Sequence, residues 1–199
     1  MSKLDKCNIK IRALTDNKEI LNRCRTTVWK EGLDKEPTIL FMEDIYKAEH
    51  SPIRDKWFSI EIKNIPYWLS THFVRHSIGY TPYVSTQRDD RISYEGDRDD
   101  RRQGELVNMD ITLNAQSFIN VSKVRLCGQA HPLAQLLWKK VLEVLKTLDE
   151  PLANNCVPTC IYRGFCPEKY PCGRLSEGSK TLEFYKEWRK SYIGNRPKL

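Results

Sequence analysis

Arg75 and His76 stand side by side ahead of a polar turn that contains Gly79. An arginine presents a planar fork of N–H donors that matches the oxygens of a phosphate or a carboxylate. A histidine beside it can donate to a phosphate or hydrogen-bond to a heterocyclic ring. Ser85 and Arg88 follow in the same segment and add a hydroxyl and a second guanidinium. These residue types predict that the segment binds an anionic ligand.

The residues before this pair indicate the element that positions it. Apolar side chains recur at helical spacing, at Ile65, Trp68, Leu69 and Phe73. Pro66 lies where the first turn of a helix tolerates proline. The pattern therefore predicts a helix over residues 65–73 that ends next to Arg75 and His76. His72 falls on the apolar face of that helix, so a buried core histidine and a ligand contact both remain open.

Further patterns predict the rest of the secondary structure. Apolar residues that alternate or recur at helical spacing indicate strands over residues 9–14 and 57–62, and helices after residue 16 and over residues 38–47, 113–127, 132–148 and 179–192. His131 precedes one of these helices and is expected to cap it or to face solvent. Residues 88–105 mix acidic and basic side chains around Gly96 and Gly104, which predicts a solvated loop. A mobile lid over an anionic substrate is the alternative.

Composition limits the class of protein. With 199 residues, 40% of them hydrophobic, the chain is long enough to bury the core of one globular domain. No apolar run approaches the roughly 18 residues of a membrane span and residues 1–6 lack a signal-peptide core, so we expect a soluble cytoplasmic protein without a membrane partner. The net charge of +7 favours anionic partners. The basic residues are scattered and match no nucleic-acid-binding module, which disfavours nucleic acid.

The order of these motifs resembles the flavin-dependent thymidylate synthases. The signature of that family is Arg-His-Arg, seven variable residues and Ser, usually running into Gln-Arg. It stands here as Arg75-His76-Ser77, seven residues and Ser85, followed by Thr86-Gln87-Arg88. Spacing matches Ser85 to the family serine, whereas the following Gln-Arg matches Thr86 to it, and both alignments remain open.

A second motif of the family, Asn-x-Arg-Ser followed by Leu-Arg, looks like Asn114-Ala115-Gln116-Ser117 and Val124-Arg125. The eleven-residue separation of Asn114 and Arg125 is about three helical turns, so both can face one site. The flavin-contacting loop of the family typically ends in Ser/Thr-Pro, which matches Ser51-Pro52 after His50. The resemblance spans roughly residues 48–148.

The resemblance implies a fold, an assembly and a reaction. The fold would be α+β, with an antiparallel sheet packed with a helical bundle over residues 1–150 and a Cys-rich extension with a terminal helix over residues 151–199. The family forms homotetramers whose active sites combine several subunits, with FAD at the interface and dUMP stacked on the flavin. The implied reaction is reductive methylation of dUMP to dTMP at pyrimidine C5. Methylenetetrahydrofolate would supply the one-carbon unit and NADPH the hydride, without a cysteine nucleophile on the enzyme.

Site residues carry over from the family motifs position by position. The FAD contacts would be Ser51, Arg75, His76, Ser77, Asn114, Gln116 and Asn120. The contacts to the pyrimidine nucleotide would be His72, Ser85, Thr86, Gln87, Arg88 and Arg125. Ser85 and Arg125 would be the catalytic residues. Arg125 would lie nearest the uracil, where its charge stabilises the negative charge that develops on the ring during attack at C5.

Three positions depart from the family pattern and indicate a divergent member. Ser77 and Gln116 stand where the family has arginines, and His72 stands where it has glutamine. The changes leave two alternatives to dTMP synthesis. One is a related flavoenzyme that makes another C5-modified pyrimidine, such as a hydroxymethyl product. The other is a non-catalytic relative that binds nucleotides or nucleic acid.

Four cysteines of the predicted extension stand in turn-rich sequence, at Cys156, Cys160, Cys166 and Cys172. Four thiolates would suit the tetrahedral preference of Zn²⁺, although the spacing lacks the close Cys-x2-Cys pairs of common zinc modules. Disulfides are disfavoured because nothing in the sequence indicates secretion. A zinc site and ordinary reduced thiols therefore remain open.

Overall fold

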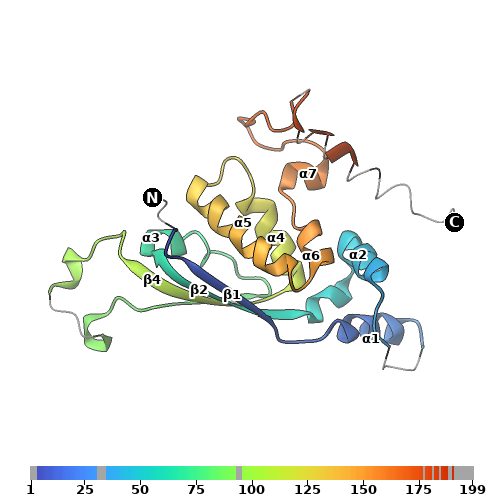
Figure 1. Cartoon of the computed structure of the whole chain (residues 1–199), viewed down its shortest axis with the longest axis horizontal. Coiled ribbons are helices and arrows are strands. Elements are labelled where there is room, and N and C mark those ends of the chain that lie inside the picture. The colour runs from blue at the N-terminus through green and yellow to red at the C-terminus, as the bar shows by residue number, and fades with distance from the viewer. Residues whose placement is uncertain are drawn as a thin grey trace.

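The computed structural model describes residues 4–30, 35–92, 96–176, 178–180, 182, 183, 185–187 and 190. Its centre is a four-stranded antiparallel sheet in the order β1-β2-β4-β3. The strands are β1 (Asn8–Ala13), β2 (Trp57–Pro66), β3 (Tyr80–Val84) and β4 (Leu106–Asn114). In Figure 1 the helices α4 (Ala115–Arg125), α5 (Pro132–Lys146) and α6 (Glu150–Asn155) lie together on one face of this sheet. The architecture is α+β, as the motifs predicted.

The core lies between the sheet and these helices. Alternating residues of the two central strands are buried, namely Phe58, Ile60 and Ile62 on β2 and Val107, Met109, Ile111 and Leu113 on β4. Helix α5 covers them with an apolar stripe of Leu137, Trp138, Val141 and Leu145. Burying one side chain of this size contributes about 1.5–3 kcal/mol. The spacing of apolar residues along the strands and along α5 thus determines which faces of the sheet and of the helical layer pack together.

Two helices precede β2 along the chain. Helix α1 (Asn17–Thr27) is capped by Asp16, and α2 (Ile39–Ala48) is capped by Thr38; each of these side chains accepts a backbone N–H of the first turn. Helix α2 ends at Glu49, whose backbone is left-handed with φ 48°. The 3₁₀ turn η1 (Ser51–Asp55) then leads into β2. The predicted strands at 9–14 and 57–62 and the predicted helices at 38–47 and 132–148 are confirmed to within a few residues.

The helix predicted over residues 65–73 is wrong for most of its length. Ile65 still belongs to β2, and only α3 (Tyr67–Ser70) is helical. The register of β2 shifts between Ile62 and Ile65, and Asn64 in this bulge has φ 61°. A bulge returns the next apolar side chain to the buried face after three residues instead of two, which imitates helical spacing in the sequence.

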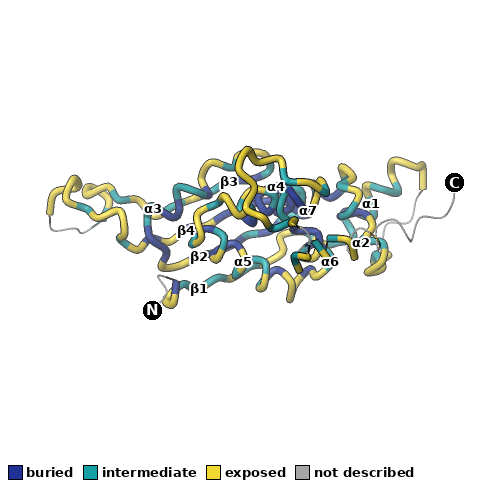
Figure 2. Tube along the Cα trace, turned by 90° about the horizontal axis from the view of Figure 1, so that it is seen from above, coloured by how far each residue is buried: buried dark blue, intermediate teal, exposed yellow. Residues whose placement is uncertain are grey.

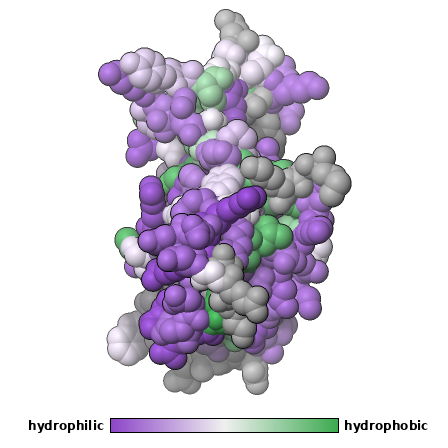
Figure 3. All heavy atoms as spheres, turned by 90° about the vertical axis from the view of Figure 1, so that its left-hand side faces the viewer, coloured by the Kyte–Doolittle hydropathy of each residue, from purple (hydrophilic) through white to green (hydrophobic). Residues whose placement is uncertain are grey.

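Neither β3 nor β4 is among the elements predicted from the sequence, and the helix expected to start at residue 113 starts at Ala115. Between the two strands the chain extends away from the sheet as an exposed arm, described for residues 86–92 and 96–105, with two short 3₁₀ turns, η2 (Asp89–Arg91) and η3 (Arg98–Asp100) (Figure 2). Seen from this end of the molecule, the surface is mainly hydrophilic (Figure 3). The predicted solvated loop is confirmed for the described residues of the arm, and the mobile lid stays a prediction.

The chain after α6 forms a small unit around α7 (Thr159–Arg163), with its own cluster of buried residues, Val157, Cys160 and Ile161. Of the helix predicted over 179–192, residues 180, 182, 183, 185–187 and 190 are helical, residue 179 is not, and the others lie outside the described residues. The domain boundary at residue 150 stays a prediction. None of the helices in the described part of the chain is long and apolar enough to cross a membrane.

Candidate functional site

The segment that carries Arg75 and His76 runs from His72 to Gly79, and helix α4 contacts it at both ends. At its start, Asn114 caps the helix, because its side-chain oxygen accepts the N–H of Ser117 at 3.0 Å. At its end, Arg125 is the last helical residue. A helix of 11 residues is about 16 Å long. Asn114 and Arg125 therefore lie at opposite ends of α4 and meet different parts of the same segment.

A glycine turn fastens this segment to the start of α4. The N–H of Asn114 donates to the carbonyl of Gly79 at 3.0 Å, and the Ser117 hydroxyl donates to the carbonyl of Ile78 at 2.6 Å. Gly79 has φ 61°, and a Cβ atom at this residue would lie 2.5 Å from Nδ2 of Asn114. Only glycine lets the turn approach the Asn114 amide this closely.

Arg125 holds the other end of the segment. Its Nε donates to Nε2 of His76 at 3.1 Å, and a terminal nitrogen donates to the carbonyl of His72. The guanidinium also lies 5.6 Å from the centre of the Phe73 ring. Burial lowers the pKa of Arg125, and the nearby charge of Arg75 acts in the same direction. Arginine stays protonated at neutral pH, so the site contains a partly buried positive charge.

His76 is held in one protonation state. Burial, and then the positive charge of Arg125, lowers the pKa of His76 to about 4. The ring is therefore neutral at pH 7. Because Nε2 accepts from Arg125, the proton of the neutral ring must be on Nδ1. His76 can thus donate one hydrogen bond to a bound ligand without adding charge.

Tyr80 belongs to the same cluster, although sequence analysis missed it. This first residue of β3 is 4% exposed, and its ring centre lies 5.5 Å from that of His76. Burial raises the pKa of the Tyr80 hydroxyl, against the opposing effect of Arg125, so the hydroxyl stays protonated at neutral pH. Its oxygen is buried and has no hydrogen-bond partner among the residues that the structure describes. The position of Tyr80 depends on the pairing of β3 with β4, which no local pattern reveals.

His72 is partly exposed, so the structure excludes the core position that the sequence left open. Its ring centre lies 5.9 Å from that of His131 and 6.1 Å from that of Trp68. Burial, and then the charges of Arg125, His131 and Arg75, lower the pKa of His72. His131 caps α5, because its Nδ1 accepts the backbone N–H of Leu133 at 3.1 Å. Capping was one of the two roles expected from the sequence. His131 is a second neighbour of the site that the motifs did not indicate.

A second group of predicted cofactor contacts lies around Glu49. Nε2 of Gln116 donates to the Glu49 carboxylate at 2.5 Å and to Oδ1 of Asn120 at 3.4 Å, and Nζ of Lys123 donates to the same carboxylate at 2.7 Å. A carboxylate only accepts hydrogen bonds, so it orients the Gln116 amide with its NH₂ group inward. Gln116 therefore offers a ligand its carbonyl oxygen, an acceptor, where the family has the cationic donor of an arginine.

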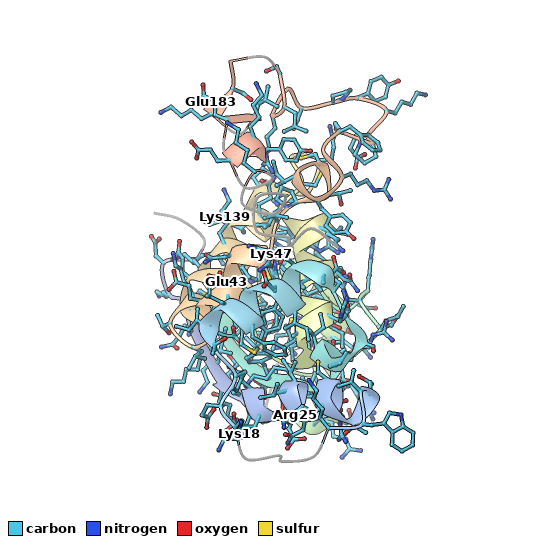
Figure 4. The ribbon with its side chains drawn as sticks, turned by 90° about the vertical axis from the view of Figure 1, so that its right-hand side faces the viewer. Lys18, Arg25, Glu43, Lys47, Lys139 and Glu183 are labelled. Carbon is cyan, nitrogen blue, oxygen red and sulfur yellow. The ribbon has the colours of Figure 1, made fainter. Side chains whose placement is uncertain are left out.

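Beside this group lies a cavity of about 680 Å³ between α1, α2 and η1. Ser51 lines it together with His50, and several apolar side chains form its walls, among them Val28, Phe41 and Ile45. Figure 4 views this end of the molecule, with Lys18 and Arg25 on α1 and Glu43 and Lys47 on α2. A concave, mostly apolar space of this size is typical of small-molecule sites.

The predicted nucleotide contacts that follow β3 lie far from the start of α4; they are Ser85, Thr86, Gln87 and Arg88. Ser85 continues the ladder between β3 and β4, because its N–H donates to the carbonyl of Asn108 at 2.9 Å. Asn108 precedes Asn114 by six residues of β4, which is about 20 Å at 3.3 Å per residue. One chain therefore does not bring these four residues next to Asn114.

The arm is held at its base by Arg101. The Arg101 guanidinium donates to both oxygens of Glu105 and to the carbonyl of Gln87, the latter at 3.2 Å. Arg88, in contrast, forms an exposed pair with Asp90, with N–O distances of 2.8 and 2.5 Å. The base of the arm is therefore fixed, whereas Arg88 can exchange Asp90 for an anionic ligand at low cost, because exposed ion pairs contribute little.

The four predicted zinc ligands are not gathered into one site. Cys156 is buried, and burial, opposed by a hydrogen bond with Ser122, raises its pKa to about 12. Cys172 is exposed and lies against Gly128. A Cβ atom placed on Gly128 would lie 2.7 Å from Sγ of Cys172. Among the described residues no group of three or more His, Cys, Asp or Glu side chains is arranged to hold a metal ion. The zinc site stays a prediction that the geometry does not support.

No protein-family model and no curated protein matches the sequence. Solved structures do match. A UMP/dUMP methylase, PolB from Streptomyces cacaoi, bound with 5-Br dUMP, has a TM-score of 0.60 and 10% identity, over 80% of this chain and 95% of its own. Two structures of the flavin-dependent thymidylate synthase ThyX from Helicobacter pylori, with FAD and dUMP, have TM-scores of 0.57 and 0.59 and identities of 14% and 13%. These two matches span 75% and 74% of this chain and 99% of each Helicobacter pylori chain. The chain therefore has the fold of the flavin-dependent thymidylate synthases, which is the fold that its motifs predicted.

Proposed function

We propose that this protein is a flavin-dependent enzyme that transfers a one-carbon unit to C5 of a pyrimidine nucleotide, and that it converts dUMP to dTMP. The observation that carries the proposal is the pair of positive charges on Arg125 and Arg75, with His72, neutral His76 and the buried Tyr80 hydroxyl beside them. Arg125 bonds to a neutral histidine and a backbone carbonyl rather than to a carboxylate, so its charge is available to an anion. Gathered positive charge favours an anionic ligand.

The residues along α4 fit a flavin. The Asn114 amide beside Gly79, the Nδ1–H of neutral His76 and the carbonyl oxygen of Gln116 are uncharged groups that suit the polar edge of the ring system. The exposed Arg75 suits the phosphates of FAD. When bound, FAD would supply the hydride, taken from NADPH, that reductive methylation consumes. Methylenetetrahydrofolate would supply the carbon.

Arg125 would hold the pyrimidine ring. A partly buried guanidinium next to a uracil carbonyl stabilises the negative charge that develops on the ring when C5 attacks the one-carbon donor. His72, where the family has glutamine, would contact the nucleotide from the same side. Ser85 and Arg88 would bind its phosphate, for which an exposed hydroxyl and an exchangeable guanidinium are suited.

The position of Ser85 in the sheet supports a site shared between chains. About 20 Å of β4 separates Ser85 from Asn114 within one chain, so a site that combines Asn114 with Ser85 and Arg88 would take the latter two from a second chain. We propose that sites are shared between subunits of a homotetramer. Sedimentation equilibrium of the purified protein measures the number of subunits, and a monomer would contradict this arrangement.

The reaction is the first test. The purified protein is incubated with NADPH, methylenetetrahydrofolate and either dUMP or UMP, and the nucleotide product is identified by mass spectrometry. A C5-methylated nucleotide and a flavin absorbance spectrum would support the proposal. A hydroxymethylated nucleotide would show that the enzyme catalyses another C5 modification instead of methylation. A protein that binds neither FAD nor a pyrimidine nucleotide would refute the proposal and favour a non-catalytic relative.

Two matched variants locate the site. Arg125→Met should lower kcat/KM by about 10²- to 10³-fold, because it removes the charge nearest the reacting ring. Arg12→Met, at an exposed position of the edge strand β1, makes the same chemical change away from the site and should leave kcat/KM unchanged. Equal rates in the two variants would contradict the role of Arg125.

A further inference from the structure

Tyr80 has a buried hydroxyl that no described residue satisfies. The side chain is 4% exposed, and its oxygen has no hydrogen-bond partner among the described residues. Buried polar side-chain atoms nearly always have a partner in folded proteins, and an unpaired one costs free energy. An unpaired hydroxyl in a candidate site therefore indicates a partner other than the described residues.

The surroundings of Tyr80 show which kind of partner is missing. Arg125 lies close enough that it and Tyr80 change the pKa of one another, but a guanidinium only donates hydrogen bonds. The His76 ring lies 5.5 Å away, and its one acceptor, Nε2, is already bonded to Arg125. Neither neighbour therefore has a free acceptor for the Tyr80 hydroxyl. What it lacks is an acceptor for its own hydrogen.

We propose that Tyr80 is a ligand-binding residue that donates a hydrogen bond to a carbonyl oxygen of the planar ring held at Arg125. The proposal rests on the proposed function and adds a residue to it. Carbonyl groups flanking a ring N–H are shared by uracil and by the isoalloxazine of FAD, so the chemistry of the acceptor is the same for both.

A neighbouring tyrosine provides a matched control. Tyr83 lies on the same strand with its side chain on the opposite face and is 63% exposed. Tyr80→Phe and Tyr83→Phe each delete one phenolic oxygen and keep the ring. The first removes the unpaired hydroxyl, and the second removes a solvated one.

Two readouts on the same variants test the proposal. The first is the thermal unfolding midpoint of the ligand-free protein, which Tyr80→Phe should leave unchanged or raise, because it removes an unsatisfied polar group. The second is the Kd for FAD and, separately, for dUMP, measured by fluorescence or calorimetry. Tyr80→Phe should raise one of these Kd values by about 3- to 10-fold, the worth of one hydrogen bond. The ligand whose Kd rises is the one whose carbonyl Tyr80 contacts, and Tyr83→Phe should change neither readout.

The outcomes separate this proposal from the proposed function. A lower midpoint in ligand-free Tyr80→Phe would show that the hydroxyl has a partner within the protein and would overturn the proposal. Unchanged Kd values for both ligands in Tyr80→Phe, with normal binding by the wild type, would overturn it while leaving the proposed function intact. A wild-type protein that binds neither ligand would refute both.

Discussion

A buried hydrogen bond joins α2 to α6. The Tyr46 hydroxyl donates to Oδ2 of Asp149 at 2.7 Å, and these residues are 0% and 5% exposed. Oδ1 of the same carboxylate accepts the N–H of Leu152 at 3.1 Å and so caps α6. Because α2 leads directly to Glu49 and the cavity at Ser51, this bond holds one wall of the candidate cofactor site against the helical layer.

Tyr46→Phe keeps the ring and deletes the donor. A hydrogen bond to a charged group contributes about 1.5–3 kcal/mol, and the variant leaves the Asp149 carboxylate buried with one donor fewer. For a chain of this length 1 kcal/mol corresponds to about 2–4 °C, so we expect a loss of about 2 kcal/mol and a fall in Tm of about 4–8 °C. Urea unfolding followed by circular dichroism measures the change. Burial raises the pKa of Asp149, so the measurement is made at pH 8, where the carboxylate is ionised.

A double-mutant cycle shows whether the loss belongs to this bond. Asp149→Asn keeps an oxygen for the cap, since asparagine and aspartate cap helices about equally well. In the presence of Tyr46→Phe, Asp149→Asn should cost about 1 kcal/mol less than it does alone, because the partner is already gone. Tyr170→Phe, at a position that is 72% exposed, is the control and should lie within about 0.5 kcal/mol of the wild type. A Tyr46→Phe protein as stable as this control, or strictly additive losses, would refute the reasoning.

Two further predictions concern the site. Gly79→Ala should lower the free energy of unfolding by at least about 2 kcal/mol, because φ is 61° and the new Cβ would lie 2.5 Å from Nδ2 of Asn114; Gly104→Ala, with no atom within 4 Å of its Cβ, is the control in the same urea titration. The pKa of His76 is lowered from 6.5 to about 4, by burial and then by Arg125. Neutral His76 therefore contributes stability above pH 6.5 that is lost as the pH falls to about 4. Urea midpoints across this range should fall less in His76→Gln, and equal slopes would contradict the assignment.

The fold was predictable where apolar spacing is regular and uninterrupted. Helix α5 shows its stripe in the sequence, and β4 alternates from Val107 to Leu113 so regularly that the pattern could have been recognised. Strand β3 offers no such signal, because it lies at the edge of the sheet and includes Pro82. The bulge at Asn64 produced the wrong helix over residues 65–73, since it gives a strand the apolar spacing of a helix.

The candidate site was predictable only as far as its motifs reach. Arg125 and His76 were selected from the sequence, and the structure joins them by a hydrogen bond across 49 residues. Tyr80 and His131 were not selected as site residues, because one is brought to the site by strand pairing and the other by the start of α5. The contact between Gln116 and Glu49 was equally hidden, since it depends on the fold of two helices that are far apart in sequence.

The candidate site costs the ligand-free chain stability, and this cost is itself an argument for a ligand. Burial lowers the pKa values of His72 and Arg125. Nearby cations act in the same direction, Arg125 and Arg75 on His72 and Arg75 on Arg125, so like charges face one another. The Tyr80 hydroxyl is buried without a partner among the described residues. None of these features helps the chain to fold, and natural sequences depart from such local rules mainly at functional sites. Helix α4 holds the residues of the site in place, because Arg125 at its end contacts His72 and His76 and Asn114 at its start contacts Gly79. A ring carbonyl bound there would accept hydrogen bonds from both the guanidinium and the Tyr80 hydroxyl, so the residues that weaken the free site favour the occupied one.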